Sequence, residues 1–254
     1  MSKKKIFWGI TLIISMLACI LAVCYIVLYF FSGNDTNKYI IEETSYISTE
    51  IMPVCENHNL NWKKIQKDNS DIYSWIYIPG TKVDYGVVQA SGKNGEGDDF
   101  YLNHNLQKKY EFAGSIYSEM QNAKDYSDPV TVLYGHNMLN GTMFASLHQF
   151  EDKKFFKKHK YIYVYTPQHR LTYEIYAAYV YDDRHILNSF DFSDKKILKN
   201  YFKYTLNPES VNKNTRKADL DTGSRILTLS TCTNGAKNTR YLVQGVLIKD
   251  ERTN

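Results

Sequence analysis

The distribution of hydrophobic residues divides the chain into an apolar N-terminal run and a longer segment of mixed pattern. Residues 6–31 contain no charged side chain, and about 20 apolar residues are enough to cross the hydrocarbon core of a bilayer. Three lysines precede this run, and no further Lys or Arg follows until Lys38. The positive-inside rule therefore predicts a cytoplasmic tail at 1–5, a membrane anchor at 6–31 and an extracellular remainder. A cleaved signal peptide would have a shorter apolar region and a small-residue cleavage site, so the pattern favours an uncleaved anchor.

After the anchor, the pattern predicts a linker and then a domain dominated by strands. Residues 32–56 are polar and show little periodicity, which predicts a stalk. Residues 57–69 have apolar positions at Leu60, Trp62 and Ile65 and predict a short amphipathic helix. Eight short runs rich in Val, Ile and Tyr then predict strands at 73–78, 84–89, 114–117, 130–134, 161–165, 171–181, 225–230 and 241–249. Eight strands are enough to close a small barrel.

Two helical segments interrupt the predicted strands. The first lies at 143–150. The second lies at 194–206, where Ser193 is a suitable N-cap and apolar residues such as Leu198 and Tyr201 share one face. The resulting prediction is a mostly β domain at 57–254, long enough to bury its own core.

Charge and cysteine content narrow the function classes. The formal net charge is +4, but three of the 31 Lys and Arg residues precede the anchor, so the other 28 nearly balance the 27 Asp and Glu. This balance gives no electrostatic basis for binding nucleic acid. Cys19 and Cys24 lie in the anchor, and only Cys55 and Cys232 lie beyond it, so the chain is not a disulfide scaffold. It also contains no HExxH or Cys-x-x-Cys spacing, so a zinc site is not predicted.

Three residues have the positions expected of a cysteine acyltransferase. Cys232 ends an apolar run, and Arg240 opens the next one eight residues later, so strand pairing would place them side by side. His136 follows the run at 130–134 after a single glycine. Such residues can supply a nucleophile, a proton shuttle and an oxyanion partner. The alternatives are a buried small cysteine, a surface arginine and an ordinary histidine.

Five other histidines lie in polar or helical segments without a partner motif and are not selected. They are His104, His148, His159, His169 and His185.

Several motifs together resemble the sortases, and specifically class B. The main ones are Tyr134-Gly-His-Asn-Met138, then Thr228-Leu-Ser-Thr-Cys232, then Arg240 on the following strand. Further similar segments are Trp75-Ile-Tyr-Ile-Pro-Gly-Thr81, Val87-Val-Gln89 and Gly141-Thr-Met-Phe144. The helix at 194–206 is similar to the class B insertion between the sixth and seventh strands. Gly86 departs from the pattern, because relatives often carry proline there. The resemblance covers residues 57–249.

The resemblance implies a closed eight-stranded barrel with an N-terminal helix and a transpeptidase on the outer face of a Gram-positive membrane. Cys232 would cleave an Asn-Pro-x-Thr sorting signal of a secreted protein after threonine and form a thioester. A peptidoglycan-precursor amine would resolve it, with His136 transferring protons and Arg240 holding the oxyanion. No metal or organic cofactor is implied. The polar neighbours expected to contact substrate are Asn137, Ser230, Thr231 and Asn234.

Three other functions remain open. The acceptor could be a lysine amine of a pilin subunit, which would make the protein a pilin-polymerising enzyme. A papain-like cell-wall peptidase is a second alternative, although such enzymes place the cysteine before the histidine and do not use an essential arginine. A tethered, non-catalytic binding domain is the third, and it predicts no role for Cys232.

Overall fold

The computed structural model describes residues 3–31, 60–235 and 238–253. The chain separates into two units, Met1–Asn34 and Asp35–Asn254. In the first unit, helix α1 (Lys3–Phe31) contains an 18-residue stretch, Ile10–Val27, that is long and apolar enough to cross a membrane. The predicted stalk at 32–56 and Cys55 lie outside the described residues.

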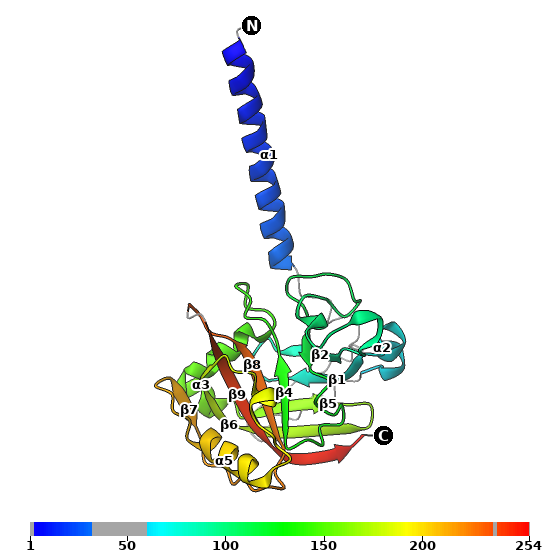
Figure 1. Cartoon of the computed structure of the whole chain (residues 1–254), viewed down its shortest axis with the longest axis vertical. Coiled ribbons are helices and arrows are strands. Elements are labelled where there is room, and N and C mark those ends of the chain that lie inside the picture. The colour runs from blue at the N-terminus through cyan, green and yellow to red at the C-terminus, as the bar shows by residue number, and fades with distance from the viewer. Residues whose placement is uncertain (1–2, 32–59, 236–237, 254) are drawn as a thin grey trace, which may run out of the picture. The chain divides into compact units, whose positions relative to one another are not determined.

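Eight strands of the second unit form a closed barrel, which confirms the predicted fold class (Figure 1). The order around the barrel is β5-β1-β2-β3-β4-β8-β9-β6, and pairing of β5 with β6 closes it. The strand bounds are β1 Ile72–Tyr77, β2 Asp84–Gln89, β3 Ile116–Ser118, β4 Val130–Tyr134, β5 Tyr161–Tyr165, β6 His169–Asp182, β8 Ile226–Cys232 and β9 Thr239–Arg252. A ninth strand, β7 (Lys213–Thr215), pairs outside the barrel with the second half of β6.

Short helices precede the first strand or connect the later ones. They are α2 Trp62–Asp68, η2 Lys93–Gly95, η3 Phe100–Leu102, η4 Phe144–Glu151, α3 Lys153–Lys158, α4 Ile186–Ser189 and α5 Lys195–Leu206, where η denotes a 3₁₀ helix. The prediction of Ser193 as the cap of the second insertion is wrong. Asp194 caps α5, because its carboxylate accepts from the backbone N–H of Lys196 at 2.7 Å. The Ser193 hydroxyl donates to Asp191 instead, at 2.6 Å.

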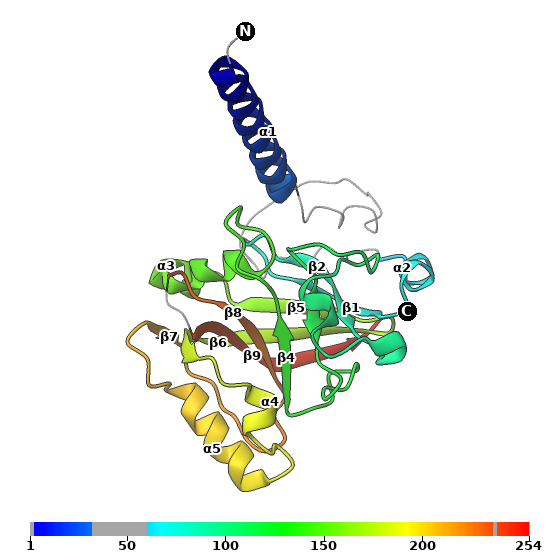
Figure 2. The same cartoon turned by 45° about the horizontal axis from the view of Figure 1, so that its top comes forward.

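The insertion that contains α4 and α5 covers part of the outer face of the barrel. Figure 2 shows the two helices together on one side of it. Buried Leu198 and Tyr201 of α5 pack in one cluster with Val132 of β4 and Ile226 of β8. Because successive strand residues point to opposite faces, the outward positions of β8 are Ile226 and every second residue after it, ending at Cys232. The insertion therefore lies over the same face of the sheet that carries Cys232.

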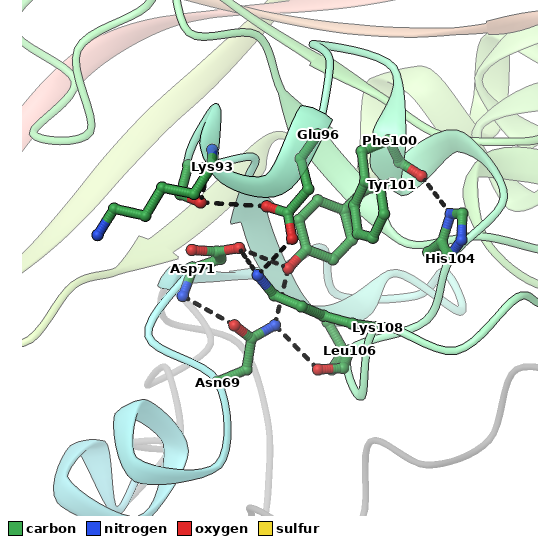
Figure 3. Close-up of polar contacts among 10 residues, drawn as sticks. Asn69, Asp71, Lys93, Glu96, Phe100, Tyr101, His104, Leu106 and Lys108 are labelled. Carbon is green, nitrogen blue, oxygen red and sulfur yellow. Dashed lines mark hydrogen bonds and ion pairs between the residues drawn. The ribbon is translucent and has the colours of Figure 1, made fainter.

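A buried polar cluster fixes the segment between β2 and β3 (Figure 3). Lys108 Nζ lies 2.7 Å from Asp71 and 3.0 Å from Glu96. The Tyr101 hydroxyl donates to the Asp71 carboxylate at 2.8 Å, and the Asn69 side-chain amide donates to that hydroxyl at 2.9 Å. These contacts join the end of α2 and the start of β1 to η3. They thereby position the backbone carbonyl of Leu102, the residue that follows Tyr101.

Candidate active site

Three neighbouring strands bring the predicted residues into one row. Strands β4 and β8 are parallel, with Tyr134 opposite Ser230, and β8 and β9 are antiparallel, with Cys232 directly opposite Arg240. His136 and Cys232 each lie two residues beyond the Tyr134–Ser230 pair. Because side chains alternate and adjacent strands lie about 4.8 Å apart, Cys232 and Arg240 share the outer face, and His136 lies just past the end of β4 at the same end of the barrel. The predicted pairing of the Cys232 and Arg240 strands is confirmed.

Cys232 is a free, exposed cysteine at the end of β8. Two of the polar neighbours expected to contact substrate are buried: Ser230 is 5% exposed and Thr231 is 2% exposed. Thr231 belongs to the opposite, inward face of the strand. Among the described residues, no group of three or more His, Cys, Asp or Glu side chains could hold a metal ion.

His136 is held by a backbone carbonyl and an aromatic ring. Its Nε2 lies 2.8 Å from the Leu102 carbonyl oxygen, and its ring stacks on Phe112 with a centroid distance of 5.7 Å. A carbonyl oxygen only accepts hydrogen bonds, so this contact places a hydrogen on Nε2. The other ring nitrogen, Nδ1, is then the one that remains for proton exchange.

Arg240 is half-buried, and its Nη1 donates to the Thr239 carbonyl at 3.2 Å. Within the part of the chain that the structure describes, no carboxylate forms an ion pair with Arg240. Burial raises the pKa of the nearby Tyr134 phenol, and the Arg240 guanidinium acts in the opposite direction. The guanidinium is thus a positive charge on the outer face beside Cys232, with donors available for an anion.

Two side chains contact the backbone of Cys232: Asn137, which was expected to contact substrate, and His148, which the sequence analysis did not select. The Asn137 side-chain amide donates to the Cys232 carbonyl oxygen at 3.0 Å and to the Asn234 side-chain oxygen at 2.8 Å. His148 Nε2 also lies 3.0 Å from the Cys232 carbonyl oxygen, and its Nδ1 lies 2.6 Å from the Glu151 carboxylate. The only sequence signal for His148 is its i,i+3 spacing to Glu151.

Replacing Gly114 with alanine should destabilise the support of His136. Gly114 has φ of +59°, and a Cβ atom built there would clash with the Leu102 carbonyl oxygen, the atom that holds the His136 ring. The backbone strain and the clash together should lower the free energy of unfolding by about 2–4 kcal/mol. Chemical denaturation measures this loss.

Gly95 provides the matched control, because its φ is +80° but no atom lies within 4 Å of a Cβ built there. Gly95→Ala should cost only about 1–2 kcal/mol, the strain of the left-handed backbone. Equal losses at the two positions would contradict the close approach of Gly114 to Leu102.

Comparison with known proteins identifies the family of the chain. A sortase domain model matches residues 76–248. Sortase B of Listeria monocytogenes is 29% identical over 188 residues, covering 73% of each chain. The structure of Clostridium perfringens sortase B is 34% identical and covers 74% of this chain and 100% of its own, with a TM-score of 0.66. A Streptococcus pyogenes class B sortase involved in pilus biogenesis is 28% identical, with coverage of 74% and 98% and a TM-score of 0.62. The chain therefore belongs to the sortase family of cysteine transpeptidases, and within that family to class B.

Proposed function

We propose that this sortase attaches secreted proteins to the cell wall by cleaving an Asn-Pro-x-Thr sorting signal after threonine. The observation that supports this most strongly is the row of His136, Cys232 and Arg240 on adjacent strand ends. Sortases act on a sorting signal and a cell-wall amine. The specific motif rests on the class B relationship.

In the first step, the Cys232 thiolate attacks the threonine carbonyl carbon. A carbon–sulfur bond forms, the peptide bond after threonine breaks, and His136 gives a proton to the departing amine. Because Leu102 occupies Nε2, the proton moves through Nδ1 of His136. In the second step, the nitrogen of a peptidoglycan-precursor amine forms an amide bond to the threonine carbonyl carbon and gives a proton to His136. The carbon–sulfur bond breaks, and sulfur leaves as the Cys232 thiolate, which restores the starting state.

Arg240 stabilises the negative charge that develops on the threonine carbonyl oxygen. It lies opposite Cys232 on β9, and a guanidinium presents several donors in a fixed plane. Asn137, Ser230, Thr231 and Asn234 were expected to contact substrate. The hydrogen bonds of Asn137 to the Cys232 carbonyl and to Asn234 support a role in positioning the backbone for these two asparagines, and the burial of Ser230 and Thr231 argues against direct contact with substrate.

An Asn-Pro-x-Thr peptide should be cleaved after threonine, and a Leu-Pro-x-Thr-Gly peptide should be a poor substrate. Mass spectrometry of the products from both peptides, incubated separately with the enzyme, measures this preference. Cleavage of Leu-Pro-x-Thr-Gly with Asn-Pro-x-Thr left intact would contradict the proposed motif. It would leave the thioester chemistry in place.

The pilin-polymerising alternative is favoured by one observation, the relationship to a Streptococcus pyogenes class B sortase involved in pilus biogenesis. The two functions differ in the acceptor amine. A competition between a wall-precursor stem peptide and a lysine-containing pilin peptide, with the thioester donor held constant, separates them. Wall anchoring predicts that the stem peptide is the preferred acceptor.

We further propose that residues 1–5 lie in the cytoplasm, 6–31 span the membrane, 32–56 form a stalk and 57–254 act outside the cell. A protein that lacks residues 1–31 should be soluble and should cleave a free peptide at the full-length rate, because His136, Cys232 and Arg240 all lie in the second unit. In cells, the same truncated protein should anchor no surface protein. Activity that disappears with residues 1–31 in the peptide assay would contradict this division of roles.

A further inference from the structure

The carbonyl oxygen of Cys232 lies at an edge where the sheet ends. Strand β4 pairs with β8 only as far as Gly135, whose N–H donates to the Ser230 carbonyl at 3.2 Å. In a strand, alternate carbonyls point to the same edge, so the Cys232 carbonyl points toward the space beyond the end of β4. Asn137 and His148 are its hydrogen-bond partners, each at 3.0 Å.

Both side chains come from the segment that follows His136. Asn137 pairs with Met143 in an isolated bridge, and the Phe144 N–H donates to the His136 carbonyl at 3.0 Å. These contacts fold the loop back on itself, so that η4 begins beside His136 and carries His148 to the end of β8. The candidate nucleophile and the candidate proton shuttle therefore share one backbone support.

The hydrogen-bond partners determine where the hydrogens of His148 lie. The Glu151 carboxylate at 2.6 Å requires a hydrogen on Nδ1, and the Cys232 carbonyl at 3.0 Å requires one on Nε2. Asn137 Nδ2 donates one of its hydrogens to the Cys232 carbonyl and the other to the Asn234 side-chain oxygen. It has no third hydrogen for His148 Nε2, which lies 3.2 Å away, so these two nitrogens are neighbouring donors. Every contact with an acceptor is satisfied when His148 is an imidazolium.

One neighbour of the His148 ring favours this state. The side chain is only 11% exposed, and burial disfavours a positive charge, but Glu151 of the same helix supplies the compensating negative charge. On β9, the Tyr241 ring stacks against it with a centroid distance of 4.8 Å. From β8, the backbone carbonyl of Cys232 contacts Nε2 of the His148 ring. These are the titratable groups in contact with the ring among the described residues, and Glu151 is the only anion among them.

His148 lies behind the strand, on the side away from the thiol. Tyr241 pairs with Thr231, and both belong to the face of the sheet opposite to Cys232 and Arg240. A ring stacked on Tyr241 does not reach a substrate on the outer face. Its effect on Cys232 must pass through the backbone.

We propose that His148, held as an imidazolium by Glu151, acts with Asn137 as a positioning pair that fixes the backbone of Cys232. Its importance for catalysis rests on the proposed function of Cys232 as the nucleophile. On the β9 side, Thr233 and Thr239 continue the contact beyond Cys232 through a 3.5 Å backbone hydrogen bond and a bond between their hydroxyl groups. On the opposite edge, where β4 has ended, the Asn137–His148 support takes the place of the missing strand beside the residue whose thiol must be aligned with the substrate carbonyl.

The protonation of His148 can be tested without any substrate. Nitrogen-15 NMR of the imidazole rings at pH 7 should show hydrogens on both ring nitrogens of His148, assigned by comparison with His148→Gln. In Glu151→Gln the anion is lost, and the double protonation should be lost with it at the same pH. A neutral His148 ring in the parent protein would overturn the proposal, whether or not the enzyme cleaves a sorting peptide.

The positioning role is tested by kinetics with a matched control. His148→Leu removes the donor and should lower kcat for peptide cleavage about tenfold with KM unchanged. His148→Gln keeps an amide donor and should recover most of that loss. The control is His169→Leu, because His169 forms a similar pair with Asp250, at 2.7 Å, at the start of β6. An unchanged kcat in His148→Leu, or an equal loss in His169→Leu, would overturn the positioning role. If the parent cleaves no sorting peptide, the rate of Cys232 alkylation replaces kcat, and the same comparisons apply.

Discussion

Replacing Cys232 with alanine should abolish peptide cleavage while the barrel remains folded. The thiol is the only group in the row that can form the proposed thioester, so kcat should fall by at least about a thousandfold. Cys232 is exposed at the end of β8, and its side chain fills no core position. The free energy of unfolding should therefore change by less than about 0.5 kcal/mol. Peptide turnover followed by chromatography, together with chemical denaturation, measures both quantities.

Cys232→Ser provides a second test of the nucleophile. A serine hydroxyl is nearly the same size but is far harder to ionise than a thiol, so this variant should be almost as inactive as alanine. The thioester can also be sought directly, by mass spectrometry of the parent enzyme quenched with acid during turnover. Substantial turnover in Cys232→Ala would remove the thioester mechanism and favour a different nucleophile.

Replacing His136 with glutamine should lower kcat by roughly a hundredfold to ten-thousandfold, the range expected for loss of general acid–base catalysis. Glutamine can still donate to the Leu102 carbonyl, so the fold around η3 should be kept. The parent rate should fall on both sides of an optimum pH, and His136→Gln should flatten that profile. A pH–rate profile of kcat/KM for both proteins measures the change, and an unaltered profile would contradict the role of His136.

The same series should include Arg240, because it acts on the other side of Cys232. Arg240→Lys keeps the charge but loses the planar set of donors, so it should also be impaired. Arg170 offers a matched control: it is a partly buried arginine on β6 that pairs with Glu251 at 2.6 Å. Arg170→Lys should keep the parent kcat. If both Arg240→Lys and Arg240→Ala equal the parent, Arg240 does not hold the oxyanion.

The parts of the fold that local pattern determines were predictable. The barrel strands are runs of Val, Ile and Tyr, and burial on at least one face imposes that composition. Strand β7 was missed because its three residues, Lys213–Thr215, are polar and too few to show a period. Helix α3 was also missed, since four of its six residues are lysines and its start depends on the Asp152 cap. Serine is a suitable cap, but the cap position also depends on local hydrogen bonds: the Ser193 hydroxyl donates to Asp191, and the Asp194 carboxylate accepts from the N–H of Lys196.

The site also has contacts that local sequence predicts and contacts that it does not. The pairing of Cys232 with Arg240 follows from a short hairpin, and local spacing is enough to predict it. The approach of His136 to Cys232 depends on parallel pairing between strands far apart in the chain, and only the family resemblance indicated it. The contacts of Asn137 and His148 end on a backbone carbonyl. Every residue has a carbonyl, so no residue type in the sequence marks this contact.

The two strand pairings that build the site also differ in how soon they can form. The β8–β9 hairpin closes a short loop, so Cys232 and Arg240 can meet early in folding. The parallel β4–β8 pair requires everything between residues 134 and 226 to be bridged, and contacts of such long range form slowly. His136 therefore joins the other two residues only after β4 and β8 have paired. Under the proposed mechanism, a newly emerging chain would place its thiol beside its arginine before the proposed proton shuttle arrives. Peptide cleavage should therefore appear together with the last cooperative step of folding.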